Sequence, residues 1–215
     1  MSSPEAYFKA LEWVRRQTFL RTKSYRMLSD GVQGEFLQTL SLMARPTRVL
    51  EIGTFSGYAT LCLARGFVGR EQDCVIDTFE VNDELRDLYL EAFEMAGFQV
   101  NPAAFTGPSD PGTIRAHLQD ALDAAPLMDS YDIVYIDANK REYPAYLEAF
   151  ASKVRPGGWL LADNVLWNGL AAREDRPHDR QTEAIVAFNS ALAADPRFRS
   201  TILPIRDGLY VARRV

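Results

Sequence analysis

The sequence predicts an α/β fold in which a mostly parallel sheet carries helices on both faces and ends in an antiparallel hairpin. After residue 45, short apolar segments alternate with longer amphipathic ones, as strands alternate with helices in this class. Each short segment is nearly continuous in apolar residues, which is typical of parallel strands buried on both faces. No linker or repeat interrupts the 215 residues, so we expect one domain, 1–215.

Within this domain, residues 1–45 are expected to be mostly helical and residues 46–215 to form the core. Strands are expected at 48–52, 74–80, near 101–107, at 131–137 and at 159–163, and a hairpin across Arg206-Asp207-Gly208. Hydrophobic periodicity predicts helices at 57–67, 83–97, 112–125, 143–154 and 182–195. Gly97 and the run Pro156-Gly157-Gly158 are typical stops for two of these helices.

Composition excludes several classes of function. The net charge of −5 argues against a nucleic-acid partner, whose phosphates require basic side chains. No apolar stretch approaches the roughly 18–20 residues of a membrane span, and the first residues lack the apolar centre of a signal peptide, so we expect a cytoplasmic protein. Cys62 and Cys74 lie in apolar contexts and are expected to be buried, reduced thiols.

Polar residues stand where four of the predicted strands end. They are Glu51 to Gly53, Glu80, Asp137, and the pair Asp163-Asn164. The carboxyl ends of parallel strands meet at one edge of a sheet, and ligands of open α/β sheets bind at that edge. We therefore expect these residues to converge on a ligand site.

The first two strand ends suit an adenosine ligand without a pyrophosphate. Gly53 and Gly57 allow a tight turn close to a ligand, but their spacing is not the G-x-G-x-x-G of dinucleotide-binding proteins. Glu80, 23 residues after Gly57, is placed to accept hydrogen bonds from ribose hydroxyls, and Glu51 suits a ligand amino group. S-adenosylmethionine combines these features. The alternative is that both glutamates are solvated strand-end carboxylates.

The chain resembles the cation-dependent O-methyltransferases, which include catechol and caffeoyl-CoA O-methyltransferases. The similar segments are VLEIGTFSGYATLCLA, IDTFEVN, DIVYIDANKREY, GGWLLADNVLWNG and ILPIRDGLYVARR, and RMLSDGVQGEFLQTL resembles the bacterial branch. The first five segments lie within residues 30–215 in the family's order and spacing, and the last begins at Arg26. The resemblance implies a Rossmann-like seven-stranded methyltransferase fold, with residues 1–45 packed over the site.

The same resemblance implies which residues bind S-adenosylmethionine: Glu51, Gly53, Phe55, Gly57, Tyr58, Glu80, Val81, Gly107, Ser109 and Asp137. Two positions depart from the family pattern. Ala59 replaces a serine whose hydroxyl meets the methionine carboxylate, and Asn139 replaces the second aspartate of the motif DADK. Neither change affects a metal ligand.

Asp137, Asp163 and Asn164 offer only oxygen donors, which suits Mg²⁺ best, or Mn²⁺ or Ca²⁺, and disfavours zinc. The two histidines are expected elsewhere, His117 in a helix and His178 in a polar loop. The alternative for Asp163-Asn164 is a helix cap or turn.

These features predict O-methylation of a small vicinal dihydroxy aromatic by a divalent-cation-dependent enzyme. A divalent ion that holds two neighbouring oxygens stabilises the phenolate, and Lys140 is positioned to accept the proton beside Asp137. Trp167 is expected to line the substrate pocket, with a core tryptophan as the alternative. Segment 168–181 is expected to be a mobile loop over the site or an ordinary surface loop.

Two other functions are less favoured. A dehydrogenase would need the missing pyrophosphate-binding turn, and a non-catalytic S-adenosylmethionine-binding protein would be expected to lose Lys140 or a metal ligand. The resemblance also implies a homodimer. The N-terminal apolar residues Tyr7, Phe8, Leu11 and Trp13 add to this expectation, because the core need not bury them all.

Overall fold

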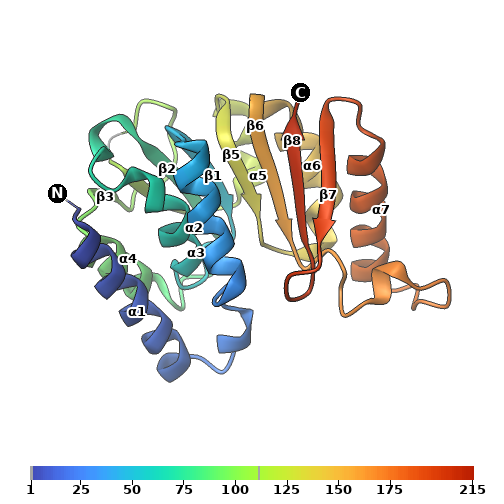
Figure 1. Cartoon of the computed structure of the whole chain (residues 1–215), viewed down its shortest axis with the longest axis horizontal. Coiled ribbons are helices and arrows are strands. Elements are labelled where there is room, and N and C mark those ends of the chain that lie inside the picture. Colours follow the sequence, from blue (N-terminus) through green and yellow to red (C-terminus); the bar gives the residue numbers. More distant parts are fainter. Residues whose placement is uncertain (1, 111) are drawn as a thin grey trace. The chain divides into compact units, whose positions relative to one another are not determined.

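The computed structural model describes residues 2–110 and 112–215, which form two compact units that divide between Leu127 and Met128 (Figure 1). Both units are of the α/β class. None of the helices among the described residues combines the length and hydrophobicity that a membrane span requires.

The N-terminal unit contains four parallel strands in the order β3-β4-β2-β1. The strands are β1 (Arg48–Ile52), β2 (Val75–Glu80), β3 (Val100–Asn101) and β4 (Ile114–Leu118). The helices are α1 (Pro4–Arg21), α2 (Val32–Ala44), α3 (Tyr58–Leu63), α4 (Arg86–Met95) and the short α5 (Ala121–Ala124). Helix α1 packs against α4 and α3, and α2 packs against α3.

The C-terminal unit also contains four strands, in the order β5-β6-β8-β7. Its elements are β5 (Tyr131–Ile136), α6 (Tyr143–Phe150), β6 (Val154–Asp163), α7 (Arg180–Ala194), β7 (Phe198–Leu203) and β8 (Leu209–Arg214). Strands β5 and β6 are parallel, whereas β8 is antiparallel to both β6 and β7. The expected class is therefore confirmed, with parallel strands throughout and an antiparallel hairpin at the C-terminal end.

One predicted helix is wrong. Residues 114–118 of the segment expected to be helical form strand β4, so the described residues contain eight strands rather than seven. Arg115 and His117 interrupt the apolar pattern expected of a buried strand. Both are nevertheless buried, because Asp77 of β2 pairs with each of them. A tertiary contact thus places polar side chains where the hydrophobic pattern of a buried strand requires apolar ones. His117 accordingly lies on a strand and not on a helix.

Helix α1 begins at a local signal and is anchored by one face. The Ser3 hydroxyl accepts the Ala6 N–H at 3.1 Å, and Pro4 occupies the first helical position. Tyr7 and Leu11 are buried, so two of the four apolar residues invoked for a dimer interface pack inside the unit. Phe8, by contrast, is 49% exposed. Both Cys62 and Cys74 are buried free thiols, as expected.

Candidate functional site

The turn after β1 depends on its glycines. Gly53 has φ +102° and donates its N–H to the Phe79 carbonyl at 2.9 Å, which joins the turn to the end of β2. Gly57 has φ +81°, and a Cβ at this position would lie 2.6 Å from Cε1 of Phe93 on α4. Gly57 is therefore required both by its backbone conformation and by the ring packed against it.

The Glu80 carboxylate is fixed by backbone donors at the end of β2. Its Oε2 accepts the Phe55 N–H at 2.8 Å, and its Oε1 accepts the N–H groups of Val81 and Asn82, both at 2.9 Å. A carboxylate offers about four acceptor positions, so one remains for a ligand donor such as a ribose hydroxyl. Glu80 is thus an oriented acceptor rather than a freely solvated carboxylate.

Glu51 is fully buried and serves the protein itself. Its Oε2 accepts the hydroxyls of Thr60 at 2.5 Å and Thr78 at 2.6 Å, and the Thr54 hydroxyl lies 2.6 Å from that of Thr78. This oxygen is committed to contacts between β1, β2 and α3. Binding of a ligand amino group by Glu51 stays a prediction.

Tyr58 and Val81, which are also expected to bind the cofactor, differ in how far they are buried. Tyr58 is buried at the start of α3, where burial raises the pKa of its hydroxyl, and a Cβ on Gly34 of α2 would lie 2.9 Å from its ring. Val81, directly after Glu80, is 74% exposed. The first turn of α2 therefore packs at the carboxyl end of β1, close to the glycine turn.

The predicted adenine contact, Ser109, lies in the loop that precedes β4, as does Gly107. The carbonyls on either side of Ser109 accept hydrogen bonds from Arg115 in the interior of β4, and the Ser109 side chain is exposed. The carboxyl end of β4 is instead marked by Leu118, which pairs with Glu80. The next two residues, Gln119 and Asp120, therefore emerge beside Glu80, and sequence reasoning missed them because β4 was expected to be helical.

Asp77, Arg115 and His117 form a buried cluster that holds the chain before β4. Arg115 donates to Asp77 at 2.6 Å, and the two His117 ring nitrogens lie 3.1 Å from Asp77 Oδ1 and 2.8 Å from the Ala103 carbonyl. The other histidine, His178, is exposed and lies 2.9 Å from Glu183. Each imidazole therefore has partners within the protein that account for its position without a role as a metal ligand.

The acidic residues of the C-terminal unit stand at neighbouring strand ends. Ile136 pairs with Ala162, so Asp137 and Asp163 follow in register on strands about 5 Å apart. Asn164 comes next with φ +58°, and no hydrogen bond within the described chain uses its side-chain amide. Two carboxylates and an open amide oxygen fit a hard divalent cation, and the surplus negative charge favours one.

No group of three His, Cys, Asp or Glu side chains within residues 2–110 and 112–215 could hold a metal ion. The expected set instead combines two carboxylates with the amide of Asn164, and its binding of a metal stays a prediction. Because this set contains no imidazole or thiolate, it fits Mg²⁺ or Mn²⁺ better than zinc.

Tyr143, which sequence reasoning missed, joins these two strand ends. Its hydroxyl lies 2.8 Å from the Asp163 carbonyl and 3.2 Å from the Ile136 carbonyl, and it accepts a hydrogen bond from Lys140 Nζ at 2.7 Å. Burial, together with the charges of Asp137 and Asp163, raises the Tyr143 pKa far above its ordinary value. The phenol therefore stays neutral. Nothing in the pattern around Tyr143 distinguishes it from a core tyrosine.

Lys140 is held inside the site and is not a solvated loop lysine. The residue is 9% exposed, and Nζ donates to Asp137 Oδ1 at 2.8 Å as well as to Tyr143. Asn139, the departure from the family motif, caps this turn by accepting the Arg141 N–H at 3.3 Å. The substitution thus keeps the local turn that presents Lys140 to Asp137.

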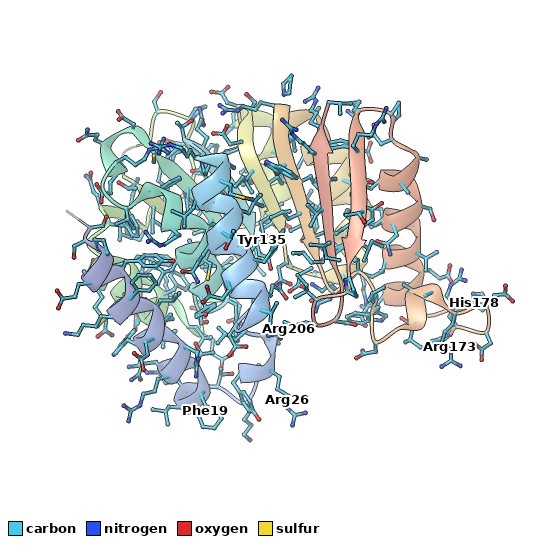
Figure 2. The ribbon with its side chains drawn as sticks, in the orientation of Figure 1. Phe19, Arg26, Tyr135, Arg173, His178 and Arg206 are labelled. Carbon is cyan, nitrogen blue, oxygen red and sulfur yellow. The ribbon has the colours of Figure 1, made fainter. Side chains whose placement is uncertain are left out.

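Trp167 belongs to a tight turn after Asn164 and is half-buried, so it is not a core tryptophan. The backbone N–H of Trp167 donates to the Asn164 carbonyl at 3.1 Å. The segment that follows, up to α7, is mostly exposed and carries Arg173 and His178 at its outer end (Figure 2). The Arg173 guanidinium pairs with Asp175 at 2.7 Å.

Each unit has the fold of α/β proteins, whose ligands bind at the carboxyl ends of parallel strands. A model of the O-methyltransferase family matches residues 2–215. Caffeoyl-CoA O-methyltransferase 2 of Populus trichocarpa is 30% identical over 194 residues, which cover 88% of this chain and 75% of the relative. The corresponding protein of Zea mays is 32% identical and covers 88% and 70%. The chain therefore belongs to the O-methyltransferase family.

Solved structures agree with this assignment. The SAH-bound methyltransferase from Podospora anserina has a TM-score of 0.77 and 25% identity, covering 100% of this chain and 90% of that one. The O-methyltransferase from Bacillus cereus, solved with SAH, has a TM-score of 0.76 and 26% identity, covering 96% and 91%. The expected Rossmann-like methyltransferase fold and enzyme class are confirmed.

Proposed function

We propose that the protein transfers a methyl group from S-adenosylmethionine to one hydroxyl of a vicinal dihydroxy aromatic compound, with a divalent cation bound by Asp137, Asp163 and Asn164. The set of oxygen donors at two neighbouring strand ends, with Lys140 beside it, is the observation that carries this proposal. Membership of the O-methyltransferase family and the caffeoyl-CoA O-methyltransferase relatives support a small phenolic substrate.

The N-terminal unit is proposed to bind the cofactor. Glu80 would accept a ribose hydroxyl through the acceptor position that its three backbone donors leave open. The glycine turn would allow close approach of the ligand to the backbone at Gly53. When bound, S-adenosylmethionine supplies the methyl group and the cation supplies charge that stabilises the phenolate.

The C-terminal unit is proposed to orient the substrate and move the proton. Lys140, as the neutral amine, is the group that would accept the phenol proton, and its buried side chain is oriented by Asp137 and Tyr143. Trp167 would contact the substrate ring. Neutral Tyr143 contributes by keeping the two strand ends in register.

Methyl transfer should be assayed with radiolabelled S-adenosylmethionine over a panel of catechols and matched monophenols, with and without EDTA. Activity should vanish in EDTA, return with Mg²⁺ or Mn²⁺, and return poorly with Zn²⁺. Asp163→Ala should abolish this rescue and leave binding of S-adenosylhomocysteine intact. An exposed aspartate gives the control, Asp129→Ala. Full activity in EDTA, or equal rates on monophenols and catechols, would contradict the metal mechanism.

A further inference from the structure

The turn that follows Asp163 is held in an unfavourable backbone conformation. Asn164, Trp167 and Asn168 have φ values of +58°, +50° and +56°, in the left-handed region that side chains with a Cβ rarely adopt. Three such residues within five positions persist only where the surrounding structure holds them. This turn carries one proposed metal ligand and the proposed substrate contact.

The turn between β7 and β8 supplies that support. The N–H groups of Val165 and Leu166 donate to the carbonyls of Gly208 and Asp207, at 3.1 Å and 2.9 Å. The Asn168 N–H donates to the Asp207 carboxylate at 2.6 Å. Asp207 is the residue that binds the strained turn through both its backbone and its side chain.

The two turns pack closely. A Cβ on Gly208, which has φ +84°, would lie 2.5 Å from Cγ of Leu166. Asp207 is partly buried, and burial raises its pKa, whereas the Asn168 N–H and the charge of Lys140 act in the opposite direction. Asp207 therefore lies within electrostatic range of the proposed base as well as in contact with the strained turn.

We propose that Asp207 is a positioning residue: its carboxylate keeps the 164–168 turn in the conformation in which Asn164 binds the divalent cation and Trp167 contacts the substrate. This inference rests on the proposed function. The carboxylate acts as a hydrogen-bond acceptor for Asn168 N–H, so an isosteric amide should replace it, because its carbonyl oxygen can accept the same bond.

Mn²⁺ binding to the purified protein, followed by electron paramagnetic resonance of free Mn²⁺, tests this role directly. Asp207→Ala should raise the Mn²⁺ dissociation constant about 10- to 100-fold, as removal of groups that orient metal ligands does elsewhere. Asp207→Asn should recover most of the affinity. In all variants the affinity for S-adenosylhomocysteine should stay unchanged, which also shows that the protein is folded.

Asp195→Ala is the matched control. Asp195 also accepts a backbone N–H, from Arg197 at 2.9 Å, but it lies at the end of α7 next to the amino end of β7, whereas Asp207 follows the carboxyl end of β7. This variant should bind Mn²⁺ as the wild type does.

The outcomes separate the two proposals. A wild-type protein that does not bind Mn²⁺ contradicts the proposed metal-dependent function. Normal wild-type binding that is unchanged in Asp207→Ala contradicts the positioning role alone. If Asp207→Asn binds as weakly as Asp207→Ala, the hydrogen bond to Asn168 is not what Asp207 contributes, and the inference fails.

Discussion

Glu80 offers a direct test of the proposed cofactor site, because each hydrogen bond of its carboxylate to the backbone is known. Glu80→Ala removes the acceptor for three backbone N–H groups. Those of Val81 and Asn82 are exposed and can donate to water instead. The Phe55 N–H is partly buried, and leaving it without an acceptor should cost about 1–3 kcal/mol of folding stability.

The effect on ligand binding is separate from this cost in stability. A ribose hydroxyl bound to Glu80 makes a hydrogen bond to a charged group, which contributes about 1.5–3 kcal/mol. Its loss should raise the dissociation constant for S-adenosylhomocysteine roughly 10- to 150-fold. Isothermal titration calorimetry measures this constant, and thermal unfolding without ligand measures the stability term.

Two further variants show whether the charge of Glu80 or its role as a hydrogen-bond acceptor causes each change. Glu80→Gln keeps an oxygen for the Phe55 N–H but loses the charge, so its stability should recover more than its affinity. Glu91→Ala removes an exposed glutamate from α4 in the same unit and should change neither quantity. An unchanged dissociation constant in Glu80→Ala would show that Glu80 organises the turn without binding the ligand.

Four other predictions follow from the same structure. Lys140→Ala should lower kcat by roughly 10²–10⁴ with little change in cofactor affinity; near-normal turnover at neutral pH would assign the proton transfer to another group. Gly57→Ala should cost about 2–4 kcal/mol in urea unfolding, because backbone strain adds to a clash with α4. Gly69→Ala, with similar φ but open space, should cost only about 1 kcal/mol. The hydrogen bond from Arg197 lowers the Asp195 pKa, so its stabilisation is present above the unfolded-state pKa and is lost as pH falls through the folded value. The difference in Tm between wild type and Asp195→Asn should therefore shrink between about pH 5 and pH 3; a constant difference would exclude the ion pair as its source. Light scattering at micromolar concentration should give the mass of a homodimer, and a monomer mass would contradict the dimer.

The strand that sequence reasoning assigned wrongly shows where a pattern loses its information. The segment around Arg115 and His117 has the polarity of a surface helix, yet both side chains are buried because Asp77 on the neighbouring strand pairs with them. A hydrophobic pattern assumes that charged residues face water. It fails when their partners come from elsewhere in the chain. Because β4 was expected to be helical, the position of Gln119 beside the end of β2 was missed as well.

By itself the sequence determined the alternation of strands and helices, the C-terminal hairpin and the strand-end acids, because hydrophobic periodicity and turn residues are local properties. Tertiary structure alone decided how the site residues are held. Tyr143 joins two strand ends. Asp207 accepts a hydrogen bond from Asn168 in the strained turn, although the two residues are 39 positions apart in the sequence. Such contacts depend on which segments meet in the folded chain, and no local pattern records that meeting.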